Sequence, residues 1–186
     1  MTLDISDRAQ FTAMAEGTAE DYAKIKVAAQ AFKQELPDRL MAYLRGLEGN
    51  TGGFRIDRLA HSLQTASRAF RDGRDDEYVA CALLHDIGDM LAPNNHSELA
   101  ACVVRPYVSE ENHWMVEHHN IFQGYYFYQH FGRDPNMRDQ FRGHPAFEQT
   151  AEFCALYDQN SFDPNYDAMP LQAFEPILQR VMTQAR

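Results

Sequence analysis

The sequence has no long hydrophobic segment. No apolar run approaches the roughly 18 residues that a membrane-spanning helix requires. The first ten residues, MTLDISDRAQ, also lack the basic and apolar regions of a secretory signal peptide. The sequence therefore predicts neither membrane insertion nor secretion, and we expect a cytoplasmic protein.

Cysteine is scarce, and basic residues are outnumbered by acidic ones. The three cysteines, Cys81, Cys102 and Cys154, lie far apart without a CxxC pair, which indicates buried thiols in a reducing compartment. The 27 acidic residues exceed the 17 basic ones and give a formal net charge of −10. A surface of this sign repels nucleic acid and anionic membranes, so neither is expected as a partner. A bound metal can reverse the local field, so the overall charge does not argue against an anionic substrate.

Repeats, low-complexity tracts and long linkers are absent, and no stretch alternates with period two. Short turn signals separate segments with helical periodicity. For example, Leu59, Leu63, Ala66 and Phe70 follow the i, i+4, i+7, i+11 spacing of an amphipathic helix. We predict one all-α domain over residues 1–186, a bundle of roughly seven to nine helices. Its motif-bearing core lies at about residues 54–160, with a helical extension at the N-terminus.

Helix-capping signals support this prediction. Thr18 and Asn95 each precede an acidic residue by three positions, and Ser109 is followed by two glutamates. Pro145 suits the first turn of a helix that continues to about Tyr157. The N-terminal extension also carries apolar residues that are expected to pack on the bundle or to support a homodimer: Tyr22, Ile25, Val27 and Phe32.

The segment Ala82–Asp89, ALLHDIGD, places a histidine and an aspartate at the end of an apolar helix. Burial of both polar groups is costly unless they are paired. A divalent cation can pair them, with the His85 imidazole as one ligand and the Asp86 carboxylate bridging to a second ion. The alternative is an ordinary helix C-terminus, at which His85 caps carbonyl groups and Gly88 ends the helix.

More histidines and another aspartate accompany this motif. His61 lies in the preceding helix, His96 at a capped helix start, and Asp158 at the end of another apolar helix. His118 and His119 lie within an aromatic-rich helix. Each residue alone suits a core or surface role. Together, in the order His, His-Asp, His, His, Asp, they form a set that can hold two metal ions inside a helical bundle.

Two segments in combination resemble the HD-domain superfamily: HSLQTA at residues 61–66 and ALLHDIG at residues 82–88. The resemblance spans about His61 to Asp158. Within the superfamily, the sequence is most similar to small diiron oxygenases typified by 2-amino-1-hydroxyethylphosphonate dioxygenase, and more distantly to myo-inositol oxygenase. His119 is preferred to His118 because residues 116–119 match the family's apolar-acidic-x-His pattern, although helical phase does not decide between them. The resemblance implies one ion held by His61, His85, Asp86 and Asp158, and a second held by Asp86, His96 and His119.

Two reactions fit this resemblance. In the first, two iron ions (Fe2+/Fe3+) and O2 act on a small hydroxylated substrate, and the protein supplies ligation and orientation. In the alternative, a divalent pair such as Mn, Mg, Ni or Zn activates water against a phosphoester. We expect the oxygenase, hold the phosphohydrolase as the alternative, and place a non-catalytic metal-binding or ligand-binding domain last.

Two positions depart from the related enzymes. Asp89 stands where many HD phosphodiesterases and myo-inositol oxygenase have lysine and the phosphonate oxygenase has histidine. Gln123 stands where the phosphonate oxygenase has a lysine, one turn after the last histidine ligand. Asp89 would either repel phosphate and favour an amine, ammonium or hydroxyl group, or point outward as a solvated residue. We therefore do not transfer the phosphonate substrate, and we take Asp86, Asp89 and Gln123 as the candidate catalytic residues.

Other side chains are candidates to contact the metal ligands or the substrate, and each has an ordinary surface or packing role as the alternative. Gln64 and Glu117 either orient ligand imidazoles or lie in solvent. Arg142 either clamps an anionic group of the substrate or lies on the surface. Of Tyr125 and Tyr126, at most one is expected to line a pocket. The remaining histidines match no ligand position and are assigned structural or surface roles: His113, His130 and His144.

Overall fold

The computed structural model describes residues 8–186, and every regular element in this range is helical. The prediction that the N-terminus carries no signal peptide concerns residues that lie mostly outside this range. The α-helices are α1 (Ala19–Gln34), α2 (Leu36–Arg45), α3 (Arg58–Arg71), α4 (Asp76–Leu84), α5 (His96–Val104), α6 (Glu110–Gln123), α7 (Phe147–Phe153) and α8 (Glu175–Val181). A π-helix (Cys154–Asp158) follows α7, and short 3-10 helices include η3 (Gly124–Tyr126), η4 (Tyr128–Phe131) and η5 (Pro135–Phe141). Between residues 8 and 186 there is no strand, so the all-α prediction is confirmed.

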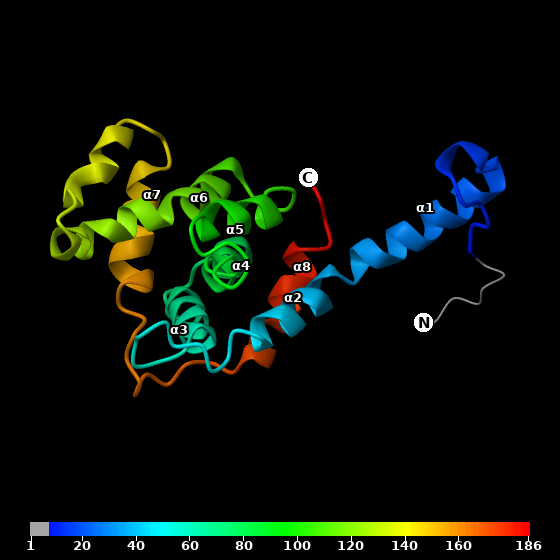
Figure 1. Cartoon of the computed structure of the whole chain (residues 1–186). Coiled ribbons are helices and arrows are strands. Elements are labelled where there is room, and N and C mark those ends of the chain that lie inside the picture. Colours follow the sequence, from blue (N-terminus) through cyan, green and yellow to red (C-terminus); the bar gives the residue numbers. More distant parts are fainter. Residues whose placement is uncertain (1–7) are drawn as a thin grey trace.

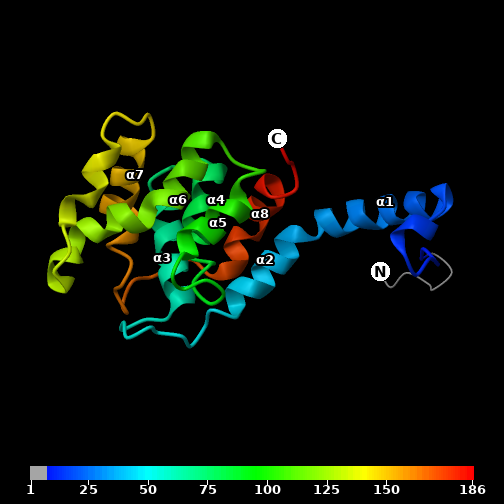
Figure 2. The same ribbon diagram turned by 45° about the horizontal axis from the view of Figure 1, so that its top comes forward.

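Helix α4 forms the centre of the bundle. Figures 1 and 2 show it surrounded by α3, α5, α6 and α8, and it packs directly on α3, α6 and α8. Every side chain from Tyr78 to Leu84 is buried. A helix that is apolar on all sides is stable only inside a core, where each buried leucine contributes about 1.5–3 kcal/mol. The apolar run before His85 therefore fixes the end of α4 in the interior of the molecule.

Helix α3 buries a different face from the one that the apolar stripe predicted. Ala66 is buried and Leu63 is partly buried, but Phe70 is 45% exposed. Small polar residues such as Ser62 and Thr65 are fully buried instead. Since α3 packs closely on α4 and also faces the site, small side chains suit this face better than large apolar ones. The predicted stripe thus lies at the margin of the buried face.

Within the N-terminal extension, α1 projects away from the bundle (Figures 1 and 2), whereas α2 packs against α8. Thr18 and Asp21 form the predicted capping box at the start of α1. The helix buries no residue, and Val27 and Phe32 are mostly exposed. Of the two alternatives for the apolar residues of α1, packing on the bundle is contradicted, and the homodimer stays a prediction.

Local predictions for the other elements had mixed outcomes. Ser109 caps α6 by accepting a hydrogen bond from the backbone N–H of Asn112. Asn95 precedes α5 but makes no side-chain cap. Pro145 lies before Ala146, the N-cap of α7, and therefore outside its first turn. Cys102 is exposed, contrary to the prediction of three buried thiols. No helix within residues 8–186 is long and apolar enough to cross a membrane.

Candidate metal centre

Six sequence-predicted ligands converge at one place in the bundle. The buried core fixes their backbone positions, because each lies at or near an end of a packed helix. They come from the first turn of α3, the residues after α4, the start of α5, the last turns of α6 and the end of the π-helix: His61, His85, Asp86, His96, His119 and Asp158. His118, the rejected alternative, stacks on Trp114 with ring centroids 4.0 Å apart and does not join the cluster.

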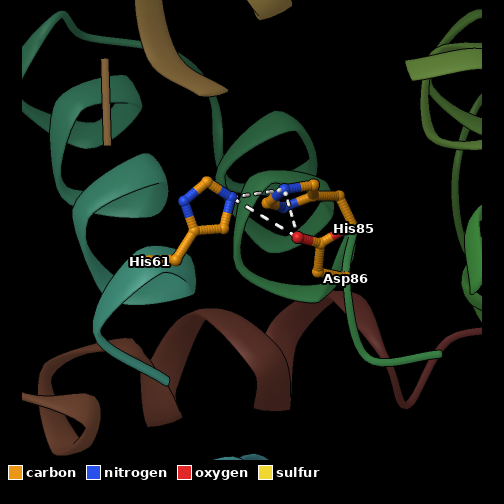
Figure 3. A group of neighbouring side chains, drawn as sticks. All are labelled: His61, His85 and Asp86. Carbon is orange, nitrogen blue, oxygen red and sulfur yellow. Dashed lines mark hydrogen bonds and ion pairs between the residues drawn. The ribbon is translucent and has the colours of Figure 1, made fainter. Parts of the chain in front are cut away.

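Three of these side chains point toward one another in Figure 3. The Nε2 atoms of His61 and His85 lie 3.2 Å apart. One oxygen of Asp86, Oδ2, lies 3.4 Å from each of these nitrogens. Asp158 completes the group, with its Oδ1 atom 3.3 Å from Nε2 of His61 and 3.8 Å from Nε2 of His85.

A second group forms around the other oxygen of Asp86. The Nε2 atoms of His96 and His119 lie 3.3 Å apart. Oδ1 of Asp86 lies 3.4 Å from His96 and 3.2 Å from His119. Asp86 therefore offers one oxygen to each pair of histidines, as a carboxylate that bridges two ions would.

The hydrogen bonds of three imidazoles indicate which ring nitrogen carries the proton of the neutral form. Nδ1–H of His61 donates to the Ser161 carbonyl, at 2.9 Å. The Nδ1–H groups of His85 and His119 likewise donate to the carbonyls of Ala82 and Val116. Because a carbonyl can only accept, Nε2 of each neutral ring is left as a bare lone pair directed at the centre of the cluster.

These lone pairs supply a test of whether the residues fit a metal. Facing lone pairs and carboxylate oxygens at 3.2–3.4 Å repel one another unless a proton or a metal cation lies between them. With metal–ligand bonds of about 2.1 Å, neighbouring ligands of one ion lie roughly 3.0–3.4 Å apart. Apart from the 3.8 Å between Asp158 and His85, the observed separations match that range, so the donors fit divalent transition metals of the kind that imidazole and carboxylate ligands bind.

Burial and the carboxylates determine the protonation of the cluster. Burial lowers the pKa of His85 to about 4 and also lowers the pKa of His96. Burial opposes the charged form of His61 as well, but Asp158 and Asp86 outweigh it and raise the pKa of His61. For Asp86, burial favours the neutral acid, yet the surrounding histidines hold its pKa well below the ordinary value. An ionised Asp86 beside a neutral His85 is the state in which both can act as ligands.

The π-helix places Asp158 in the cluster. Its wider turn is closed by the backbone N–H of Gln159, which donates to the Cys154 carbonyl, five residues back. The Gln123 side chain then donates a hydrogen bond of 2.9 Å to Oδ1 of Asp158. Gln123 therefore lies at the site, as predicted, and holds the carboxylate of a candidate ligand. No sequence pattern predicted the π-helix.

Gly88 has a role different from ending a helix. It does not have a left-handed backbone. A Cβ atom at this position would lie 2.2 Å from the carbonyl oxygen of His96 and 2.7 Å from its Cα atom. Gly88 therefore allows the backbone of the HDIG segment to contact the residue that supplies a ligand from α5.

Asp89 neither points into solvent nor presents a free charge. Its side chain is 6% exposed and forms an ion pair with Arg58. Its other oxygen lies 3.5 Å from Nδ1 of His96. Asp89 therefore accompanies the ligand His96, and its charge is balanced by Arg58, so the suggested preference for an amine has no support. Arg58 was missed, although a cation at the first residue of a helix opposes the helix dipole and could have drawn attention.

Three side chains that were candidates to contact the ligand imidazoles or the substrate make other contacts instead. Gln64 does not reach His61; its amide is bonded to the backbone of Asp163. Glu117 is partly exposed and pairs with His118. Arg142 is mostly exposed and pairs with Asp139.

A cavity of about 640 Å³ opens onto the cluster. Tyr126 lines it, whereas Tyr125 lies under Arg138 at the surface. His130 also lines the cavity, which the sequence did not predict, while His144 stacks on Trp114. The cavity gives a small molecule access to the metal ligands.

Comparison with known families matches the HD domain to residues 58–161, which is more than half of the chain and includes all six candidate ligands. A comparison with curated proteins gave no match.

Proposed function

Because the chain belongs to the HD-domain family, whose members are typically metal-dependent enzymes, we propose that it is a dinuclear oxygenase. It would oxidise a small hydroxylated substrate with O2, using iron held by the six residues of the cluster. The sequence resemblance to diiron HD-domain oxygenases supports the choice of reaction.

The observation that carries the metal-dependent function is the pairing of bare imidazole nitrogens. His61 faces His85, and His96 faces His119, at 3.2 and 3.3 Å. Their other ring nitrogens are occupied, in three of four cases by backbone carbonyls. Without a metal ion, these opposed lone pairs would repel one another in a buried place unless a ring took up a second proton.

The chain's own residues have separate tasks in this proposal. When bound, an iron pair supplies O2 activation and C–H bond cleavage. Asp86 links the two ligand groups, and Gln123 holds Asp158 through its amide N–H. The Oε1 atom of Gln123 is buried without a hydrogen-bond partner among the described residues, and Gln123 lines the cavity. This oxygen is suited to accept a hydrogen bond from a substrate hydroxyl group.

The test is metal analysis of anaerobically purified protein, followed by EPR spectroscopy after partial oxidation. The proposal expects close to two iron ions per chain, a mixed-valent signal, and consumption of O2 when a hydroxylated substrate is supplied. A protein that binds no metal would refute the dinuclear centre.

A metal-dependent phosphohydrolase is the second candidate, favoured by the family assignment itself, since HD domains include hydrolase-type enzymes. The same preparation distinguishes it. Manganese, nickel or zinc at the site, without a mixed-valent iron signal and with hydrolysis of a phosphodiester such as bis(nitrophenyl) phosphate, would favour this reaction over the oxygenase.

A further inference from the structure

The cavity has two chemically different parts. Five of the six candidate metal ligands line one part of it, and the rest of the wall combines five phenylalanine and tyrosine rings with other apolar and polar side chains. Phe162 stacks on the ring of His61, with centroids 4.5 Å apart, and Phe54 stacks on Phe162 at 4.7 Å. A continuous aromatic surface therefore begins at a metal ligand and extends outward.

A second aromatic group comes from the segment that follows α6. Phe127 and Phe131 line the same cavity and contact each other edge to face, with centroids 5.9 Å apart. Phe131 is 73% exposed, and Phe54 is also mostly exposed. Large apolar rings that line a cavity beside a polar centre and remain in water indicate a surface for an apolar ligand group.

The charged residues of the cavity wall are already paired. Arg58 is the one lysine or arginine among the described residues that line it, and it is bound to Asp89. Asp57 accepts hydrogen bonds from the backbone N–H groups of Gly49 and Ala60. Outside the candidate metal ligands and His130, the wall offers no unpaired cation for a phosphate and no carboxylate without a hydrogen-bond or ion-pair partner.

From this arrangement we propose that the outer part of the cavity is a binding subsite for an uncharged aromatic group. The substrate is then a small molecule with a hydroxylated, metal-binding head and an aromatic tail. The head rests on the proposed function; the tail rests on the cavity wall alone. Burial of a phenyl group against this wall gives about 10–100-fold tighter binding than a methyl group.

A set of diols that differ only in the attached group tests whether the cavity prefers an aromatic tail. The iron-loaded protein is titrated by calorimetry without O2, so that no turnover occurs. The four probes share one head: propylene glycol, styrene glycol, glycerol phosphate and dihydroxypropyl-trimethylammonium. The proposal expects styrene glycol to bind at least about tenfold more tightly than the other three. Tightest binding by the phosphate or the ammonium probe, or equal binding by all four, would overturn it.

Substitutions in and outside the cavity wall test where the phenyl tail binds. Phe127→Ala should remove most of the preference for the phenyl tail, measured as the ratio of Kd values for styrene glycol and propylene glycol. Phe70→Ala is the matched control, because Phe70 is exposed on α3 and does not line the cavity. An unchanged ratio in Phe127→Ala, with the phenyl preference present in the parent, would place the tail elsewhere and refute the subsite.

Ethylbenzene, which has no hydroxyl group, separates this proposal from the proposed function. Saturable binding of ethylbenzene to the metal-free protein, weakened by Phe127→Ala, supports the subsite even if no diol binds the metal. In that case the head, and with it the oxygenase, fails while the tail stands. If the diols bind but ethylbenzene does not, and no phenyl preference is seen, the aromatic subsite is refuted while the metal-binding head stands.

Discussion

Substitution of Gly88 by alanine tests whether the close contact between the HDIG segment and α5 holds the site together. The added methyl group would lie 2.2 Å from the carbonyl oxygen of His96 and 2.8 Å from its carbonyl carbon. These are backbone atoms, so no rotation of a side chain relieves the overlap. About 1 Å of relative movement is needed to restore an ordinary van der Waals distance.

This movement has two measurable effects. Overpacking of a core typically costs about 1–3 kcal/mol, and for a chain of this size each kcal/mol lowers Tm by about 2–4 °C. We therefore expect Gly88→Ala to lower Tm by about 2–12 °C. Displacement of His96 by about 1 Å also disturbs the group formed by Asp86, His96 and His119. We therefore expect one of the two ions to bind about 10–100-fold more weakly.

The assay is thermal unfolding together with metal titration of the metal-free protein. Gly46→Ala is the control, because Gly46 also has a right-handed helical backbone and its Cβ would meet only the Tyr43 carbonyl, at 3.1 Å. The control should keep both metal sites and nearly the parent Tm. A Gly88→Ala protein with unchanged Tm and two tightly bound ions would show that the contact does not constrain His96.

The other predictions concern the bridging carboxylate, the pair that holds His96, and acid stability. Asp86→Ala should abolish binding of two ions, measured as metal per chain; two ions with full activity would contradict the bridge. Asp89→Asn should weaken binding of one ion about 10–100-fold, whereas Asp139→Asn, in a surface ion pair, should not; equal metal affinity in both variants would refute the role of Asp89. Burial alone would raise the pKa of Glu77, but hydrogen bonds from Ser109 and Asn112 lower it below the ordinary 4.5. The contribution of ionised Glu77 to folding stability is therefore present above about pH 4.5, and it is lost as the pH falls through the pKa of Glu77 in the folded state. Glu77→Gln should flatten the acid limb of a plot of Tm against pH, and an unchanged limb would refute this assignment.

Chain composition and local pattern determined the fold class and the candidate ligands. The apolar run before His85 can be buried only as an interior helix, and the polar pair that follows it then requires a partner. Helical periodicity and capping by Thr18 and Ser109 are local properties, so they were readable without tertiary structure. The HD-domain assignment followed from the same segments and is confirmed by the family match.

The tertiary structure decided those features of the site that depend on contacts between residues distant in sequence. The proton on His61 is placed by a carbonyl 100 positions away, and the charge of Asp89 is balanced by Arg58 from another helix. His119 joins the cluster, whereas the ring of His118 packs against Trp114 and Phe141. The sequence shows which side chains can bind a metal or carry a charge, but the relative orientation of packed helices determines which of them meet.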